Sequence, residues 1–328
     1  MLITIAEGLN KPEIFDAVRK NLEMNVFYVH NNGEVVTEAS DRQDKSVVGT
    51  MEGYYYPYRY MALKDKNPTF AAMAKMIEDS VIDKIGAQIA YFLEDENLWK
   101  ELPTPATLPS NYVKVFPISG LVRVRKTHWD ATIISRNPVF LTFYKGNAVL
   151  QGVRFAASFF GKGQFQTTEI VADGKDWQLS QTLEGPYYQP YPKEKIPGDG
   201  DWKKLSRADR KQSEIQQYKA QATIREVAEG IEVDIDISGT DGVPVSVEFV
   251  FREGGELKNV TSVNQEKKSF LLEDGAMGTF TKGSDSIQFG PGLSKHRAFE
   301  LRGALPKMDA PTVYLTGFTP FKHTLKLS

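Results

Sequence analysis

The spacing of hydrophobic residues changes about a third of the way along the chain. Between residues 11 and 28 an apolar residue recurs at every fourth position, which predicts an amphipathic helix built on Ile14, Val18, Leu22 and Val26. A second helix is predicted to begin near Pro68, with Thr69 as its N-cap, and to carry an apolar stripe as far as Phe92. Residues 33–67 form a long, polar, tyrosine-rich connection, and such loops are usually functional or contain a short element.

Beyond residue 109 the period becomes two. Apolar and polar residues alternate at 121–125, 231–237 and 243–251, and Gly, Asp and Asn separate the short segments, which predicts an antiparallel β-sandwich. Three prolines within residues 103–109 predict the boundary. We therefore expect an α+β, mainly β protein, with a short helical region at residues 1–105 and a large sandwich at 106–328. Residues 191–211 are hydrophilic and are expected to leave the sheets as an excursion.

Composition and charge exclude several classes of protein. Of 328 residues, 41% are hydrophobic and 25% charged, which is enough apolar material for a sizeable core. No apolar run approaches the roughly 18 residues of a membrane span. The net charge of −2 gives no general reason to expect nucleic-acid binding. Residues 1–105 hold 11 basic and 17 acidic residues, whereas the remainder holds 29 and 25, so the sandwich is mildly basic and favours an anionic ligand.

The reactive side chains are few. The chain has no cysteine, which excludes disulfides and thiolate chemistry, and its four histidines are scattered, so we expect no metal and no cofactor. Nucleotide-binding, serine-hydrolase and zinc-protease signatures are absent. The first residues lack the basic region of a signal peptide, and the location stays open: cytoplasmic, or periplasmic or secreted if the true N-terminus is missing.

The densest candidate site lies between residues 41 and 60. Asp41 and Arg42 precede a run that holds five tyrosines and Arg59 within eight residues. Tyrosine can act as a general acid or base or stack on a sugar ring, and arginine recognises carboxylates through two hydrogen bonds. The alternative is an aromatic wall against the helices. His30 is either a C-cap that closes the first helix or a catalytic group beside this cluster.

The β-region offers further candidates for ligand binding. Arg123 and Arg125 share one strand face, so an exposed arginine pair with His128 and Trp129 could hold an acidic sugar. The alternative is a solvated outer face with Trp129 in the core. Aromatic and turn segments add the candidates Tyr187, Tyr188 and His296.

Several of these motifs resemble a known family. Residues 32–38, 40–44 and 54–60 look like the last helical hairpins of an (α/α) toroid, and 119–125 and 314–321 are similar to segments of the sandwich that follows it. The chain thus resembles the C-terminal part of the heparinase II/III-like polysaccharide lyases and their bacterial relatives. These enzymes cleave uronate linkages by β-elimination.

The resemblance implies an acidic polysaccharide or oligosaccharide as partner, with catalytic roles for His30, Tyr54, Tyr56, Arg59 and Tyr60. The expected substrate-binding residues are Asp41, Arg42, Arg123, Arg125, His128, Trp129, Tyr187, Tyr188 and His296. Most of the toroid is not in this sequence, so a homo-oligomer or a missing N-terminal helical domain would have to complete it. The alternatives are a non-catalytic carbohydrate-binding or scaffold sandwich, or a glycoside hydrolase that uses Asp41, Asp44 and Glu52.

Overall fold

The computed structural model describes residues 1–40, 42, 47–266 and 268–328. The chain divides into two compact units. Unit 1 comprises residues 1–132 and 144–147, and unit 2 comprises residues 133–143 and 148–328. The last helical turn ends at Trp99 and the first strand begins at Tyr112, so the secondary structure changes across the proline-rich segment, while the first strands belong to the compact unit of the helices. The predicted α+β class with a β-sandwich is confirmed.

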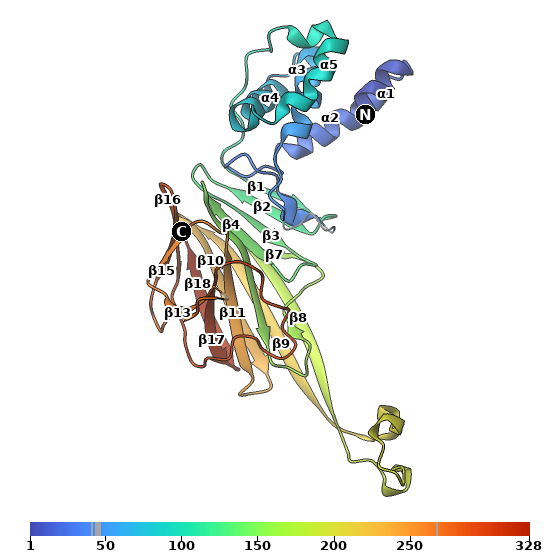
Figure 1. The fold of residues 1–328 in the computed structure, drawn as a ribbon, viewed down its shortest axis with the longest axis vertical. Helices are drawn as coiled ribbons and strands as arrows, with labels where there is room; N and C mark the ends of the chain where they lie inside the picture. Colours follow the sequence, from blue (N-terminus) through green and yellow to red (C-terminus); the bar gives the residue numbers. More distant parts are fainter. Residues whose placement is uncertain (41, 43–46, 267) are drawn as a thin grey trace. The chain divides into compact units, whose positions relative to one another are not determined.

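Unit 1 is built around short helices (Figure 1), and the buried apolar side chains of these helices form one core. Its α-helices are α1 (Leu2–Gly8), α2 (Ile14–Asn25), α3 (Tyr55–Asp65), α4 (Pro68–Val81) and α5 (Ile89–Glu94). Its 3-10 turns include η1 (Thr37–Ala39), η3 (Glu52–Tyr54), η4 (Ile85–Gln88) and η5 (Glu96–Trp99). The core is fixed at its centre by Tyr58, which is fully buried and donates its hydroxyl to the Leu22 carbonyl at 2.8 Å.

The tyrosine-rich connection contains a short helix, α3, which was one of the two expected alternatives. The predicted second helix, by contrast, is interrupted after Val81 and is followed by η4 and α5. A period of four residues predicts where an apolar face lies but does not predict such interruptions, because adjacent short helices can bury the same stripe.

The N-cap of α4 is Asn67 rather than the expected Thr69. The Asn67 side-chain oxygen accepts hydrogen bonds from the backbone N–H groups of Thr69, at 2.9 Å, and of Phe70, at 3.1 Å. Pro68 then occupies the first helical position, where its missing N–H costs nothing. The cap therefore lies two residues before the expected one.

We expect Asn67→Ala to lower the free energy of unfolding by about 1 kcal/mol, because two helix N–H groups lose their acceptor. Thr69→Ala should leave it within about 0.5 kcal/mol, as for substitutions away from such features. Urea denaturation of the two variants measures the difference. Equal losses, or a larger loss for Thr69→Ala, would contradict the assignment of the cap.

Four strands follow the proline-rich segment. β1 (Tyr112–Phe116) pairs antiparallel with β2 (Leu121–Arg125) within unit 1. β3 (Asp130–Ile134) and β4 (Leu141–Lys145) each contribute residues to both units. In β2 and β3 nearly every side chain is buried, so these strands do not show the exposed outer face that alternation suggested for 121–125.

Two sheets form unit 2 (Figure 1). Beyond β3 and β4 the first sheet runs in the order β5 (Ala148–Ala157), β11 (Pro244–Phe251), β17 (Thr312–Phe318), β14 (Ser269–Leu271) and β13 (Thr261–Asn264), with β6 (Gly163–Gln164) beside β5. The second sheet has the order β12 (Glu256–Lys258), β15 (Gly278–Lys282), β16 (Asp285–Gly290), β18 (Phe321–Leu327), β10 (Gly230–Gly239), β9 (Gln212–Val227), β8 (Asp176–Tyr188) and β7 (Val171–Asp173). β14 and β17 pair in parallel, whereas β5–β11, β11–β17 and β8–β9–β10 are antiparallel.

Aromatic rings join the two sheets of unit 2. Phe251 on β11 stacks on Phe280 of β15 with ring centres 4.7 Å apart, and Phe249 lies 5.4 Å from Phe289 of β16. The strands predicted at 231–237 and 243–251 are thus confirmed; β10 alternates between buried and partly exposed side chains, whereas β11 is buried on both faces along nearly its whole length. The predicted excursion is also confirmed, since residues between β8 and β9 form only the 3-10 turns η6 (Lys193–Lys195), η7 (Trp202–Lys204) and η8 (Arg207–Asp209) among the elements described there.

Candidate functional site

The tyrosines of α3 serve mainly as an aromatic wall. Tyr58 is buried against α2, and Tyr55 donates to Glu78 of α4 at 2.7 Å. Tyr56 stacks on Tyr91 with ring centres 3.9 Å apart. Of the three tyrosines expected to be catalytic, Tyr54 and Tyr56 line one cavity, and the ring centres of Tyr56 and Tyr60 lie 5.8 Å apart.

A first cavity in unit 1, of about 250 Å³, is lined by Tyr54 and Tyr56 together with Asn21, Gln88 and Tyr91. No charged side chain is among its described lining residues. Burial raises the pKa of Tyr56 to about 12, so this phenol keeps its proton at neutral pH. Among its described lining residues, the cavity therefore offers hydrogen bonds and ring faces but no charged side chain.

A second cavity of about 270 Å³, the Tyr60 cavity, combines charges with an apolar wall. It lies in unit 1 between the last turns of α3 and the turn η5. Its lining residues are Tyr60, Leu63, Lys64, Asp95, Asn97, Leu98 and Lys100.

Three of these residues form a chain of hydrogen bonds. Asp95 Oδ1 accepts the backbone N–H of Asn97 at 3.0 Å and its side-chain N–H at 2.8 Å. At the other end of the same amide, Asn97 Oδ1 accepts from the Lys100 ammonium at 2.7 Å. The amide is thus held at both ends and orients Lys100, for which no carboxylate partner is found in the described part of the chain.

Lys64 and Tyr60 both contact Glu7. The Lys64 ammonium lies 3.1 Å from a Glu7 carboxylate oxygen, and the Tyr60 hydroxyl donates to the same oxygen. Burial, followed by this hydrogen bond, raises the pKa of Tyr60 well above its ordinary value of 10. Tyr60 is therefore a proton donor at neutral pH and is unsuited to be the base of an elimination.

Arg59 stabilises the backbone of two residues that line the cavity, Leu98 and Lys100. Its guanidinium donates to the Leu98 carbonyl at 2.7 Å and to the Lys100 carbonyl at 3.0 Å, and lies 3.5 Å from Glu78. These bonds hold the backbone that carries Lys100. They also occupy the planar fork that we expected to bind a ligand carboxylate directly.

His30 is not the end of a helix, because α2 ends at Asn25 and His30 begins a turn. The residue is fully buried in unit 1 rather than placed beside the tyrosines. Its Nδ1 lies 2.6 Å from Asp130 Oδ1, its Nε2 lies 3.2 and 3.3 Å from the two Glu38 oxygens, and its ring stacks on Tyr144 at 3.6 Å. No substrate can reach a side chain enclosed in this way.

Arg123 completes the same cluster, which corrects the prediction of an exposed arginine pair. The Arg123 side chain is 0% exposed; it donates to Asp130 at 2.8 Å and to Thr132, which in turn donates to Glu38 at 2.8 Å. We call Glu38, His30, Asp130 and Arg123 the buried charge cluster. Arginine is rarely buried without a partner, and the carboxylate that allows it here follows only seven residues later.

The positive and negative charges of the buried charge cluster balance one another. Burial disfavours the His30 charge, but Glu38 and Asp130 outweigh it and raise the pKa of the imidazole. Burial likewise opposes ionisation of the carboxyls, yet His30 holds the pKa of Glu38 at about 2, and Arg123 with His30 holds the pKa of Asp130 far below its usual range. Two cations thus face two anions. The cluster therefore stabilises unit 1 by holding together the segments that carry its four residues.

The remaining expected residues are dispersed. Arg125 donates to the Val29 carbonyl at 3.1 Å. Trp129 is buried, in agreement with the alternative that placed it in the core, and His128 is exposed. Arg42 is exposed, and Glu52 accepts from Thr50. Asp41 and Asp44 lie outside the described residues. Tyr187, Tyr188 and His296 belong to unit 2, where His296 Nε2 donates to the Val245 and Gly317 carbonyls.

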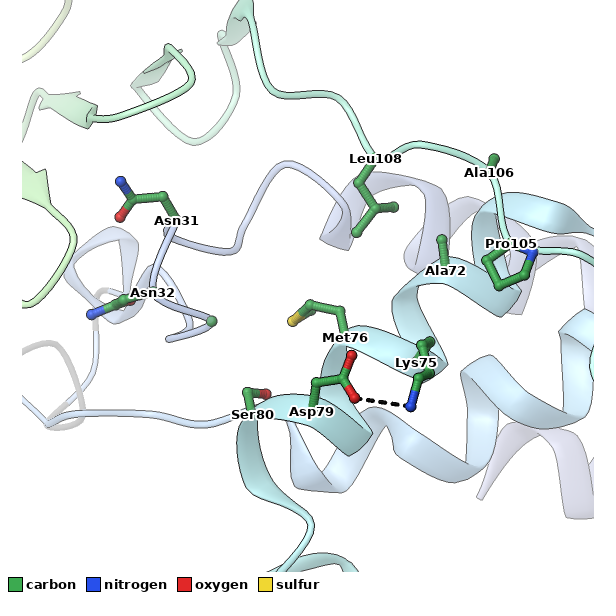
Figure 2. A pocket seen from close by; sticks show the side chains of 11 residues that line it. Asn31, Asn32, Ala72, Lys75, Met76, Asp79, Ser80, Pro105, Ala106 and Leu108 are labelled. Atoms are coloured by element: carbon green, nitrogen blue, oxygen red, sulfur yellow. Dashed lines mark ion pairs between the residues drawn. The ribbon is translucent and has the colours of Figure 1, made fainter.

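Unit 1 also has an open groove of about 520 Å³ (Figure 2). The turn at Asn32, the exposed side of α4 and residues 105–108 frame it, and the side chains of Met76 and Leu108 project into it. The Lys75 ammonium, which lines the groove, is paired with Asp79 at 2.9 Å, as the dashed line in Figure 2 shows. With an apolar centre and a neutralised cation, the groove fits an acidic sugar less well than the Tyr60 cavity does.

Asp95, Asn97 and Lys100 were not among the residues expected from sequence. The signal was present, because an Asp side chain often accepts the backbone N–H two residues later and so starts a short turn, and Asp95 caps η5 in this way. Nothing in the spacing, however, showed that the turn would face Tyr60.

Comparison with known proteins finds no matching family model and no matching curated protein. In the described residues no group of three or more His, Asp or Glu side chains could hold a metal ion. Among the described helices, none has the length and apolarity needed to cross a membrane.

Proposed function

We propose that the protein binds a uronate residue of an acidic saccharide in the Tyr60 cavity, without cleaving it. The observation that carries this proposal is the orientation of the Lys100 ammonium by Asn97 on the wall of a cavity of about 270 Å³. A cation that is held in place by a neutral amide keeps its full charge for an anionic ligand, and little entropy is lost on binding.

The rest of the cavity suits the remainder of a sugar. Asp95 can accept hydrogen bonds from hydroxyl groups, and Leu63 with the Tyr60 ring can contact the less polar face of the pyranose. Lys64 supplies a second ammonium, although Glu7 already neutralises part of its charge. This combination of a carboxylate-binding cation, a hydroxyl acceptor and an apolar wall favours a uronate over a neutral hexose.

Cleavage by β-elimination would need a base near the C5 proton as well as the neutralising cation. His30, the expected base, is enclosed in the buried charge cluster, and Tyr56 and Tyr60 keep their protons. These observations favour the non-catalytic alternative over the lyase.

Titration calorimetry with oligogalacturonate tests the proposal. We expect Lys100→Met to weaken binding about tenfold or more, since it removes a charge-assisted hydrogen bond. Lys75→Met, on the groove of Figure 2, is the matched control and should leave the affinity unchanged. If Lys75→Met weakens binding and Lys100→Met does not, the saccharide lies in the groove and the proposed site is wrong.

The same mixtures show whether the chain is an enzyme. An elimination product carries a conjugated double bond, so incubation of the full chain with uronate polymers followed by ultraviolet absorbance detects it. We expect no increase. A steady increase that Tyr60→Phe abolishes would restore the lyase interpretation.

A further inference from the structure

The strands β8 and β9 continue beyond the rest of their sheet as a two-stranded arm (Figure 1). They pair with each other from Trp177 and Ile224 as far as Tyr188 and Gln212, whereas β10 accompanies β9 only up to Tyr218. Residues 188–211, which we call the arm tip, connect the two strands at the far end. An extension of this kind adds little to the core of unit 2, so its tip is the part that calls for an explanation.

The arm tip is braced from one side. The Arg210 guanidinium lies over the rings of Tyr188 and Tyr191, 5.5 and 5.2 Å from their centres, and donates to the carbonyls of Tyr188 and Gln189 at 2.9 and 2.7 Å. Tyr191 in turn contacts Trp202 edge-on at 6.2 Å. The tip therefore has a defined arrangement that presents particular side chains.

Large apolar side chains are exposed at the arm tip. Trp202 is 75% exposed and Ile196 is 49% exposed. A single exposed apolar residue needs no explanation, but an indole and an aliphatic side chain on one small projecting tip leave apolar surface that a partner could cover.

The same segment is basic. Residues 188–211 contain seven basic and four acidic residues. Lys195 is paired with Asp209 at 2.8 Å and Lys204 with Asp199. Within the described residues no carboxylate pairs with Lys193, Lys203 or Lys211, all of which are exposed.

We infer that the arm tip docks on an anionic lipid surface. Trp202 and Ile196 would lie at the level of the headgroups, where indole rings are favoured, and the three unpaired lysines would contact lipid phosphates and carboxylates. An aliphatic side chain at a projecting end suits a lipid surface better than a polysaccharide, because sugars bind to flat ring faces and hydrogen-bonding groups, and Ile196 offers neither. A protein docked in this way lies on the membrane surface and requires no membrane-spanning segment.

Sedimentation of the full chain with vesicles tests the inference. One set contains phosphatidylcholine alone and the other phosphatidylcholine mixed with phosphatidylglycerol. We expect binding to the mixed vesicles only, with a blue shift of tryptophan fluorescence. Lys203→Gln should weaken binding about fivefold, as expected for one basic residue near an anionic surface. Trp202→Ala should weaken it about tenfold and abolish the shift.

Trp99→Ala is the matched control, because Trp99 is 62% exposed but belongs to unit 1. It should bind vesicles like the wild type. Equal binding to both vesicle sets, or full binding by Trp202→Ala, would overturn the inference. Loss of oligogalacturonate binding in Trp202→Ala, with vesicle binding intact, would assign the arm tip to the saccharide instead and would equally overturn it.

Discussion

Asp130→Asn is expected to lower the free energy of unfolding of unit 1 by about 3–5 kcal/mol, the range measured when one partner of a buried ion pair is removed. Asp130 Oδ1 lies 2.6 Å from His30 and 2.8 Å from Arg123, and Oδ2 accepts the backbone N–H of Asn31 at 2.8 Å. The substitution leaves two buried cations facing a single carboxylate, that of Glu38. Water cannot replace the lost anion, because the cluster is enclosed.

Hydrogen exchange of the segments 26–38 and 121–132, together with urea denaturation, measures this loss in unit 1 itself. Asp16→Asn is the matched control. It removes a carboxylate from an ion pair whose acid is 69% exposed, and should cost less than about 1 kcal/mol. If Asp130→Asn lowered the free energy of unfolding no more than Asp16→Asn does, the buried charge cluster would not stabilise unit 1 as we infer.

The stability of unit 1 should also fall on both sides of a mildly acidic to neutral optimum. The folded-state pKa of His30 is raised above 6.5, so its contribution is complete below pH 6.5 and is lost as the pH rises through the folded-state value. The pKa values of Glu38 and Asp130 are lowered, so their contributions are present above pH 4.5 and 3.8 and are lost as the pH falls.

Urea midpoints measured across this pH range test the prediction, with Glu38→Gln as the informative variant. Removing one of the two carboxylates that face the imidazole should move the alkaline loss of stability to lower pH. Nitrogen-15 NMR gives an independent readout, since both His30 ring nitrogens should carry protons at neutral pH. A neutral His30 at pH 7, or an alkaline limb unaffected by Glu38→Gln, would contradict the assignment.

Much of the architecture could be predicted from periodicity. The alternation at 231–237 predicted β10, in which buried and partly exposed side chains alternate, and the strand predicted at 243–251 is β11, although both faces of β11 are buried. The four-residue spacing predicted α2, although not its early end. The interruption after Val81 and the cap at Asn67 depend on local hydrogen bonds and packing that the apolar pattern does not encode.

The candidate site was predictable only in part. Tyr60 belonged to a conspicuous cluster, but its neighbours Asp95, Asn97 and Lys100 come from a turn more than thirty residues later. We expected Arg123 and His30 to be accessible to a ligand, because charged residues are usually exposed. His30 is buried because it pairs with Asp130, a hundred residues later, which a single sequence does not show, whereas the Arg123 partner Asp130 follows only seven residues later. The likeness to heparinase II/III-like lyases stays a prediction.

The most direct test of the proposed function compares two forms of one oligosaccharide. Oligogalacturonate and its carboxyl-reduced, neutral counterpart share every ring and linkage and differ only in the charged group. If the Lys100 ammonium recognises a carboxylate, wild-type protein should bind the acidic form at least about tenfold more tightly in calorimetry, and Lys100→Met should lose that preference. Equal affinity of the wild type for both forms, or no binding of either, would contradict the account.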